Sequence, residues 1–366
     1  MSKKRRYDID WIRVIVFDIL IIYHVGMFFV DWGWHIKNNE IVDWIKIPML
    51  FINQWRIPIL FVVSGMGTRF ALSYRSGPTY MRERFARLFI PLVFGILIIV
   101  PPQIYIERLT QGIPFASFLD FYPHYFEGIY PEGNFSWHHL WFLPYLLIMS
   151  LLATPIFLFL RREGNAFVKP IHQIITRSPL FLYLAVLPLA LIEVFLHDHY
   201  PVTHALVGDW YALTFYFTLF VLGHILICCS SAFWNAVLKI RYWTMAIGIS
   251  AYLIKNSLEM PPEIQDLIKV INMWSWILTI FGFSAKYLNQ ESSIIKYRNK
   301  AVYPFYILHQ TITVICGYYL INAPMHYSWK MIIMIVVTFL GAWIIYEFII
   351  LRIPFLQPLF GVKRKK

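Results

Sequence analysis

The chain has 366 residues, of which 59% are hydrophobic and only 14% are charged, and its mean hydropathy is +0.59. This composition lies far outside that of soluble globular domains and predicts an integral membrane protein. The formal net charge of +12 at pH 7 comes with no base-reading motif and no glycine-rich phosphate loop. These features argue against a nucleic-acid partner and against an ATP-driven pump.

Apolar segments long enough to cross the hydrocarbon core recur along the whole chain. We therefore expect an all-α, polytopic membrane helix bundle of about ten transmembrane helices. It should form a single integral membrane domain over residues 1–366, with no separate soluble domain. The expected spans are 11–31, 47–70, 88–106, 138–160, 179–196, 210–229, 241–258, 266–286, 303–321 and 329–351.

The distribution of lysine and arginine predicts the orientation of these spans, because both residues accumulate in cytoplasmic loops. If both termini are cytoplasmic, the inner segments, including the two basic tails, hold most of these residues. The basic charge then reports topology and contact with anionic lipids. The outer loops would hold Lys37, Lys46, Arg108, Lys255, Lys269 and Lys330.

The first span contains an arginine and a histidine inside an apolar run. Arg13 and His24 are eleven residues apart, so they share a helix face and are separated by about 16 Å of rise. Ionisable groups inside a membrane are costly and usually face a bundle interior or a watery cavity, which makes them functional candidates. The structural alternatives are interfacial anchoring of Asp10 and Arg13, and a His24 that joins two helices by a hydrogen bond.

The second span carries Arg56 at a depth comparable with that of His24, so the two residues could share a cavity. Pro58 follows two residues later and predicts a kink in this helix. An arginine that satisfies the carbonyl groups freed by Pro58 is the structural alternative.

The loop after the second span is rich in arginine. Arg84 and Arg87 are three residues apart on a helix and present two guanidinium forks on one face, which suits bidentate phosphate binding. The same charge could instead follow from the bias of basic residues toward the cytoplasm.

The fourth and ninth spans add aromatic and histidine side chains. His139 and Trp141 open the fourth span on the outer side, whereas Tyr306 and His309 open the ninth on the inner side and lie one turn apart. The aromatic residues are also typical of the belts at membrane interfaces. His309 inside an apolar helix is less easily explained in that way.

These residues together resemble the bacterial membrane acyltransferases of family 3, and within that family the branch that modifies glucans. The resemblance covers about residues 7–350. Its most specific part is the combination of Arg13 and His24 in the first span with Arg84 and Arg87 before the third span. The motifs that carry it are Arg13 with His24, Trp55-Arg56-Ile-Pro58, Arg84-Phe-Ala-Arg87, His139-Leu-Trp141 and Tyr303-Pro-Phe-Tyr306-Ile-Leu-His309.

The resemblance implies transfer of an acyl group from cytosolic acyl-CoA to a hydroxyl of an extracytoplasmic glycan or glycolipid, in the bacterial inner membrane. The glucan branch implies succinyl-CoA, and acetyl-CoA stays equally open. The resemblance also implies that His24 is the essential catalytic residue, that Arg13 lies on the acyl-donor path, and that Arg84 and Arg87 hold coenzyme A phosphates. No metal is expected.

We assign His24 as general base, because an imidazole titrates near neutral pH, and Arg56 as a donor to the developing oxyanion. An acyl-histidine intermediate stays open. Tyr306 and His309 are expected to join Arg84 and Arg87 in donor binding, and Trp141 and His139 to bind the acceptor. The alternatives are a glycan flippase or scaffold without chemistry, and a secondary transporter whose polar path would use Arg13, His24, Arg56, Glu193 and His309.

Overall fold

The computed structural model describes residues 5–162 and 164–363 of the chain. Over these residues it is helical, with one isolated bridge between Ile129 and Phe135, and this confirms the all-α class. The ends of the two basic tails, Lys3 and Lys4 at one end and residues 364–366 at the other, lie outside the described residues.

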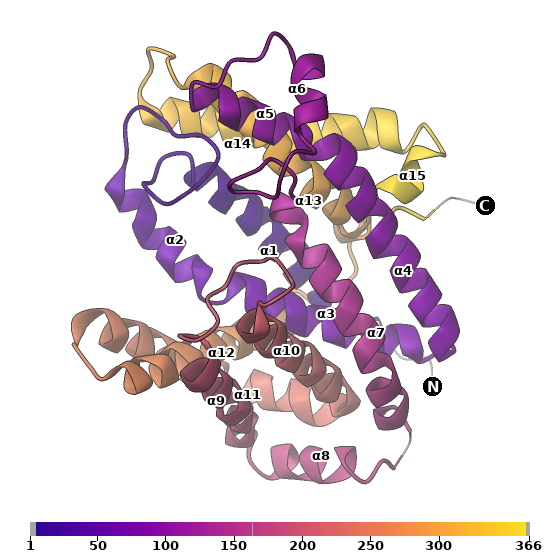
Figure 1. The fold of residues 1–366 in the computed structure, drawn as a ribbon. Helices are drawn as coiled ribbons and strands as arrows, with labels where there is room; N and C mark the ends of the chain where they lie inside the picture. Colours follow the sequence, from indigo (N-terminus) through magenta and orange to yellow (C-terminus); the bar gives the residue numbers. More distant parts are fainter. Residues whose placement is uncertain (1–4, 163, 364–366) are drawn as a thin grey trace. The chain divides into compact units, whose positions relative to one another are not determined.

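The helices divide into two compact units, and each unit is assembled from separate stretches of the chain (Figure 1). Unit 1 comprises residues 1–16, 52–84 and 145–296, and unit 2 comprises residues 17–51, 85–144 and 297–366. The chain passes from one unit to the other inside five helices, which are α1 (Tyr7–Gly26), α2 (Lys46–Asn53), α4 (Gly77–Phe94), α7 (Phe142–Leu160) and α13 (Ser293–Leu320).

Unit 1 contains most of the long helices, and α11 and α12 form its most extensive helix pair. Helix α3 packs along α10 in the same unit. The elements that lie wholly in unit 1 are α3 (Arg56–Leu72), α8 (Val168–Arg177), η4 (Pro179–Ala185), α9 (Val186–Leu196), α10 (Trp210–Cys228), α11 (Ser230–Ser257) and α12 (Pro262–Tyr287).

Unit 2 combines the second half of α1 with α13, α14 and a set of shorter elements. Two of them, η2 and η5, are π-helical turns, and η2 joins α4 to α5. The elements that lie wholly in unit 2 are η1 (Asp43–Ile45), η2 (Gly95–Ile99), α5 (Pro101–Thr110), α6 (Phe118–His124), η3 (His138–Trp141), α14 (Tyr327–Ile344), η5 (Ile345–Ile350) and α15 (Leu356–Leu359).

Among the described residues, seven helical segments are long and apolar enough to cross a membrane, which supports a multi-pass membrane protein. The other three predicted spans are helical but more polar. Helix α1 carries three acidic residues and Arg13 within one helix, and α11 and α13 mix charged or polar residues with apolar ones. The count of ten spans and the orientation of the termini therefore stay predictions. The seven segments are Asp43–Leu72, Gly77–Thr110, His138–Leu160, Pro179–Leu196, Trp210–Cys228, Pro262–Tyr287 and Tyr327–Ile350.

Helices α3 and α10 touch through glycine. A side-chain carbon added to Gly65 of α3 would overlap the carbonyl oxygen of Phe220, and one added to Gly223 of α10 would overlap that of Val62. Small residues at such positions allow two helix backbones to approach closely, which is how helices gain van der Waals contact where water supplies no driving force.

We expect the Gly65→Ala variant to lose at least about 2 kcal/mol of stability, because the added methyl group forces the two backbones apart. The measurement is the apparent melting temperature of the purified protein in detergent, which should fall by roughly 5 °C. Gly33→Ala is the matched control, since a carbon added there meets no atom within 4 Å. Equal melting temperatures for the two variants would refute the close contact.

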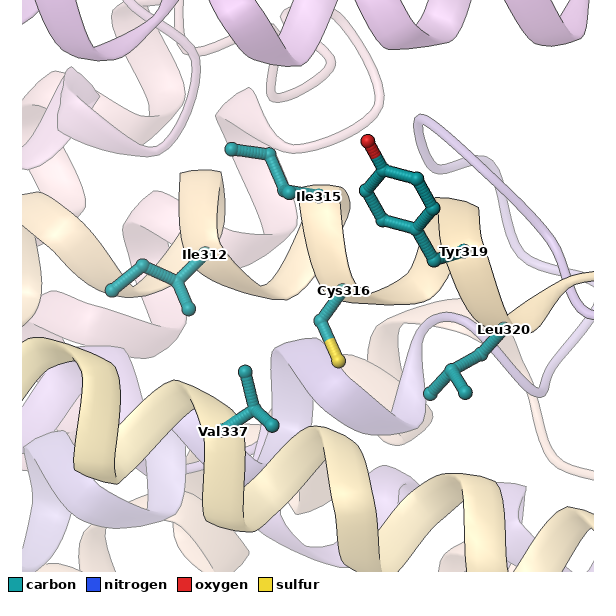
Figure 2. Close-up of a pocket in the computed structure, with 6 residues that line it drawn as sticks. All are labelled: Ile312, Ile315, Cys316, Tyr319, Leu320 and Val337. Carbon is teal, nitrogen blue, oxygen red and sulfur yellow. The ribbon is translucent and has the colours of Figure 1, made fainter.

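An apolar groove runs along α13 and α14, and Figure 2 shows Cys316 on α13 and Val337 on α14 directed toward each other. None of the predicted catalytic residues lines it, and its lining carries no charged side chain. A groove of this kind suits a hydrocarbon chain and not a phosphate-bearing donor. The lining residues are Ile312, Ile315, Cys316, Tyr319, Leu320 and Val337.

Candidate active site

Unit 2 brings His24 and His309 into direct contact. His24 lies near the end of α1 and His309 in the middle of α13, and His24 Nδ1 is 2.8 Å from His309 Nε2. The two rings are nearly parallel and meet edge to edge, with centroids 5.0 Å apart and planes inclined by 7°. His309 is fully buried, whereas His24 is half-buried.

The backbone of α13 determines which nitrogen of each ring carries the proton. His309 Nδ1 lies 2.7 Å from the carbonyl oxygen of Tyr306, and a carbonyl only accepts, so Nδ1 is the protonated nitrogen of His309. Its Nε2 must then accept a hydrogen bond from His24 Nδ1–H. By this assignment the lone pair of His24 is on Nε2, which is the form that a general base requires.

His139 and Tyr306 complete this histidine cluster. His139 Nε2 is 3.0 Å from the carbonyl oxygen of Ile307, and its ring meets that of His309 edge-on with centroids 5.1 Å apart. The hydroxyl of Tyr306 donates to the backbone oxygen of His139 at 2.5 Å. Two residues of α13 thereby hold the start of α7 in place beside His24 and His309.

The expected separation of His139, on the outer side, from His309, on the inner side, is wrong. Helix α13 begins at Ser293 and not near residue 303, so His309 lies about 24 Å along the helix. His139 precedes α7 in the turn η3, which packs against this middle part of α13. The histidines therefore meet at one depth.

Unit 1 places two of the predicted arginines beside the same stretch of α3. The guanidinium of Arg13 lies next to Gly67, where an added carbon would be 3.6 Å from Nη2 and near no other atom. Arg84 Nε donates to the hydroxyl of Tyr80 at 2.8 Å, and Arg84 Nη2 lies 3.4 Å from Thr68 Oγ1. Arg13 and Arg84 thus reach neighbouring residues of one helix.

The remaining predicted residues occupy separate positions. Arg87 follows Arg84 on α4 by three residues, and its carbonyl oxygen accepts from the hydroxyl of Tyr303 at 3.0 Å. Arg56 is buried at the start of α3 and donates from Nη2 to Asn53 Oδ1 at 3.1 Å. Trp141 ends η3 and packs edge-on against Phe142, with ring centroids 6.3 Å apart. The expectation that Arg56 shares a cavity with His24 stays a prediction.

Sequence reasoning missed a second polar cluster in unit 2. His35 Nδ1 lies 2.5 Å from Glu107 Oε2, and Gln310 Nε2 lies 2.8 Å from His35 Nε2. His138 stacks edge-on against His35, with ring centroids 4.3 Å apart. One signal was available in the sequence, since Gln310 is a polar residue in the apolar part of α13, and both Gln310 and Glu107 are almost fully buried.

Comparison with known proteins shows what this chain is related to. A family model described as an acyltransferase domain matches residues 6–347. The glucans biosynthesis protein C of Salmonella paratyphi B, of Salmonella agona and of Salmonella enteritidis PT4 is in each case 25% identical, over 98% of this chain and 95% of the relative. No solved structure matches. Since the family model spans nearly the whole chain, this protein is an acyltransferase that belongs to the membrane acyltransferases of family 3.

Proposed function

We propose that the protein transfers an acyl group from acyl-CoA to a hydroxyl of a glucan or a related glycan in the bacterial inner membrane. The histidine cluster is the main observation in favour of this chemistry, because it holds His24 in the tautomer of a base. The glycan acceptor rests on the relatives, whose name refers to the biosynthesis of glucans. Acetyl-CoA and succinyl-CoA are the two donors that we propose.

The transfer needs one proton to be moved twice. The hydroxyl proton passes to His24 Nε2 while the hydroxyl oxygen forms a bond to the thioester carbonyl carbon. When the carbon–sulfur bond breaks, His24 returns the proton to the leaving thiolate, and the products are an ester and free coenzyme A. Arg56, a buried guanidinium, remains our proposed donor to the oxyanion that forms between these steps.

His309 is a positioning residue in this scheme. Its Nε2 accepts from His24 Nδ1–H, and this contact becomes stronger when His24 takes up a proton and turns into an imidazolium. The neighbouring Tyr306 carbonyl keeps His309 in the required tautomer. From the sequence we expected His309 to take part in donor binding. We now propose that it positions His24 instead.

We propose that Arg84 and Arg87 bind the phosphates of the donor and that Arg13 lies on the path of the acyl donor. Arginine binds phosphate well because its planar fork donates two parallel hydrogen bonds. The hydroxyls of Tyr80 and Thr68 already orient the side chain of Arg84. Less conformational entropy is therefore lost when Arg84 binds a phosphate.

We expect Arg84→Ala to raise the KM for acyl-CoA by about 10-fold or more, with kcat changed less than about 2-fold, because a charge-assisted contact to phosphate contributes about 1.5 to 3 kcal/mol. Initial rates of thiol release measure both constants. Arg82→Ala is the control, since this exposed arginine lies two residues away on the same helix.

A second donor makes this test more specific. Acyl-pantetheine carries the same thioester as acyl-CoA but none of the phosphates of coenzyme A. Wild type and Arg84→Ala should use it with equal kcat/KM. A defect of the same size with both donors would show that Arg84 supports the fold or the chemistry and not the phosphates.

The function itself is tested with purified protein in lipid nanodiscs, acyl-CoA labelled in the acyl group, and a soluble glucan. The expected result is label in the glucan and one free thiol per transferred acyl group. Label that stays in acyl-CoA with and without glucan, for both acetyl-CoA and succinyl-CoA, would contradict the proposal.

A further inference from the structure

Unit 2 contains a compact group of two histidines and a glutamate. His35 lies in the segment after α1, Glu107 near the end of α5, and His138 at the start of η3. One ligand atom from each of these residues lies within 4.8 Å of the other two. Three segments that are distant in sequence therefore bring two imidazoles and one carboxylate to one point.

Glu107 is almost fully buried, and no lysine or arginine among the described residues forms an ion pair with it. Its side chain is 6% exposed, and among the described residues its one ion-pair partner is His35. The adjacent Arg108 directs its guanidinium elsewhere, to Asn134 Oδ1 at 2.8 Å and to the carbonyl oxygen of Gly133 at 2.7 Å. A buried carboxylate in such surroundings requires a positive partner.

Further polar groups fix the orientation of this pair. Tyr130 donates from its hydroxyl to Glu107 Oε1 at 3.1 Å. On the other side, Gln310 bridges His35 Nε2 and Gln103 Oε1, at 2.8 Å and 3.0 Å. Both ends of the His35 and Glu107 pair are thus held.

His138 supplies the independent observation that points to a ligand. Its Nε2 is buried and has no hydrogen-bond partner, which costs about 1 to 3 kcal/mol for a polar atom. Its backbone is in the left-handed region at φ 40°, a conformation that is unfavourable for a residue with a side chain. Ser136 Oγ accepts from the His138 backbone N–H at 3.0 Å and helps to hold this conformation. The fold therefore maintains two unfavourable features at His138, whose ring lies against that of His35.

We propose that His35, Glu107 and His138 form a binding site for a divalent transition-metal ion, with zinc as the preferred ion. Two imidazole nitrogens and one carboxylate oxygen are a common protein ligand set for zinc, and they leave a fourth position open. The ion gives Glu107 a positive charge and gives His138 Nε2 a partner. Tyr130 and Gln310 then act as the outer hydrogen-bonding partners that orient metal ligands.

Binding requires that the proton which His35 Nδ1 shares with Glu107 moves to His35 Nε2. The Gln310 and Gln103 amides must then turn together, so that Gln310 presents its oxygen to His35 Nε2–H and Gln103 presents its amide nitrogen to that oxygen. The described residues hold a second group with metal-ligand types, Glu193, His197 and Asp266. There the ammonium of Lys269 already pairs with Glu193, so we propose no metal at that group.

The inference is independent of the proposed acyl donor and acceptor. A metal at this position ties the segment after α1 to α5 and η3. His139, the next residue after His138, belongs to the histidine cluster, so the metal would also stabilise the start of α7.

The test uses the full-length protein in detergent, stripped with a chelator, loaded with zinc chloride and desalted, with metal measured by mass spectrometry. We expect one zinc per chain in the wild type and a dissociation constant at least about 100-fold weaker in His138→Ala. Cobalt should give the visible absorption of a four-coordinate site in the wild type and not in His138→Ala. His199→Ala is the matched control, because it removes an exposed histidine and should keep one zinc per chain.

Glu107→Gln is a second test of the site, which is needed if His138→Ala does not fold. Glutamine preserves the shape of the glutamate side chain but removes its charge. This variant should lose the zinc while its unloaded form remains monodisperse. Absence of zinc from the loaded wild type would overturn the proposal, as would equal zinc content in the wild type, Glu107→Gln and His138→Ala.

Discussion

Replacing His24 with alanine is expected to lower kcat/KM for acyl transfer by at least about 10³-fold, or roughly 4 kcal/mol of transition-state stabilisation. The reason is that the variant lacks the imidazole whose Nε2 takes the acceptor proton. The hydrogen bond to His309 Nε2 would also be lost, but His24 is half-buried, so little packing volume is removed. Initial rates of label transfer to glucan measure the effect.

The control for this variant is its thermal stability in detergent, which should stay within about 2 °C of the wild type, as expected for a change of less than 1 kcal/mol. An activity above one tenth of the wild-type value would remove His24 from the chemistry. Acid quenching of wild type with labelled donor and no glucan separates the two mechanisms, because label on the protein would identify an acyl-histidine and its absence would favour direct transfer.

His309→Leu should lower kcat by about 10²-fold or more and leave the KM for acyl-CoA nearly unchanged. Leucine has a similar volume but cannot accept from His24 Nδ1–H, so His24 loses both its orientation and its fixed tautomer. Loss of the orienting partner of a catalytic histidine costs up to about 10⁴-fold in the serine proteases. Steady-state kinetics with saturating glucan measure kcat and KM separately.

His309→Gln provides the rescue, because its side-chain oxygen can accept where Nε2 does now, and we expect it to recover at least about 10-fold of the lost kcat. Thr338→Val is the control for a general disturbance of α13, since Thr338 is buried and contacts Thr313 of α13 at 3.0 Å. Equal activity of His309→Leu and His309→Gln would reduce His309 to a packing residue.

Composition and hydropathy were sufficient to predict the all-helical class, because a continuous apolar run of about 20 residues can satisfy its backbone hydrogen bonds in a membrane only as a helix. The same physics identified His24 and His309, since a titratable side chain in an apolar helix is costly and therefore conspicuous. Helix ends were less predictable. Helix α13 extends to Ser293 because its first turns carry charged residues that still favour a helix but not a lipid environment.

Only the tertiary structure decided which polar groups meet. His24 and His309 are 285 residues apart in sequence, and their contact depends on how two helices pack. The proton on each ring depends on the Tyr306 carbonyl, a backbone atom that every residue possesses and no sequence pattern marks. Likewise, His35, Glu107 and His138 converge through packing of three distant segments. The sequence by itself determined which side chains are too polar for their surroundings, and the fold determined the partners that make each of them stable there.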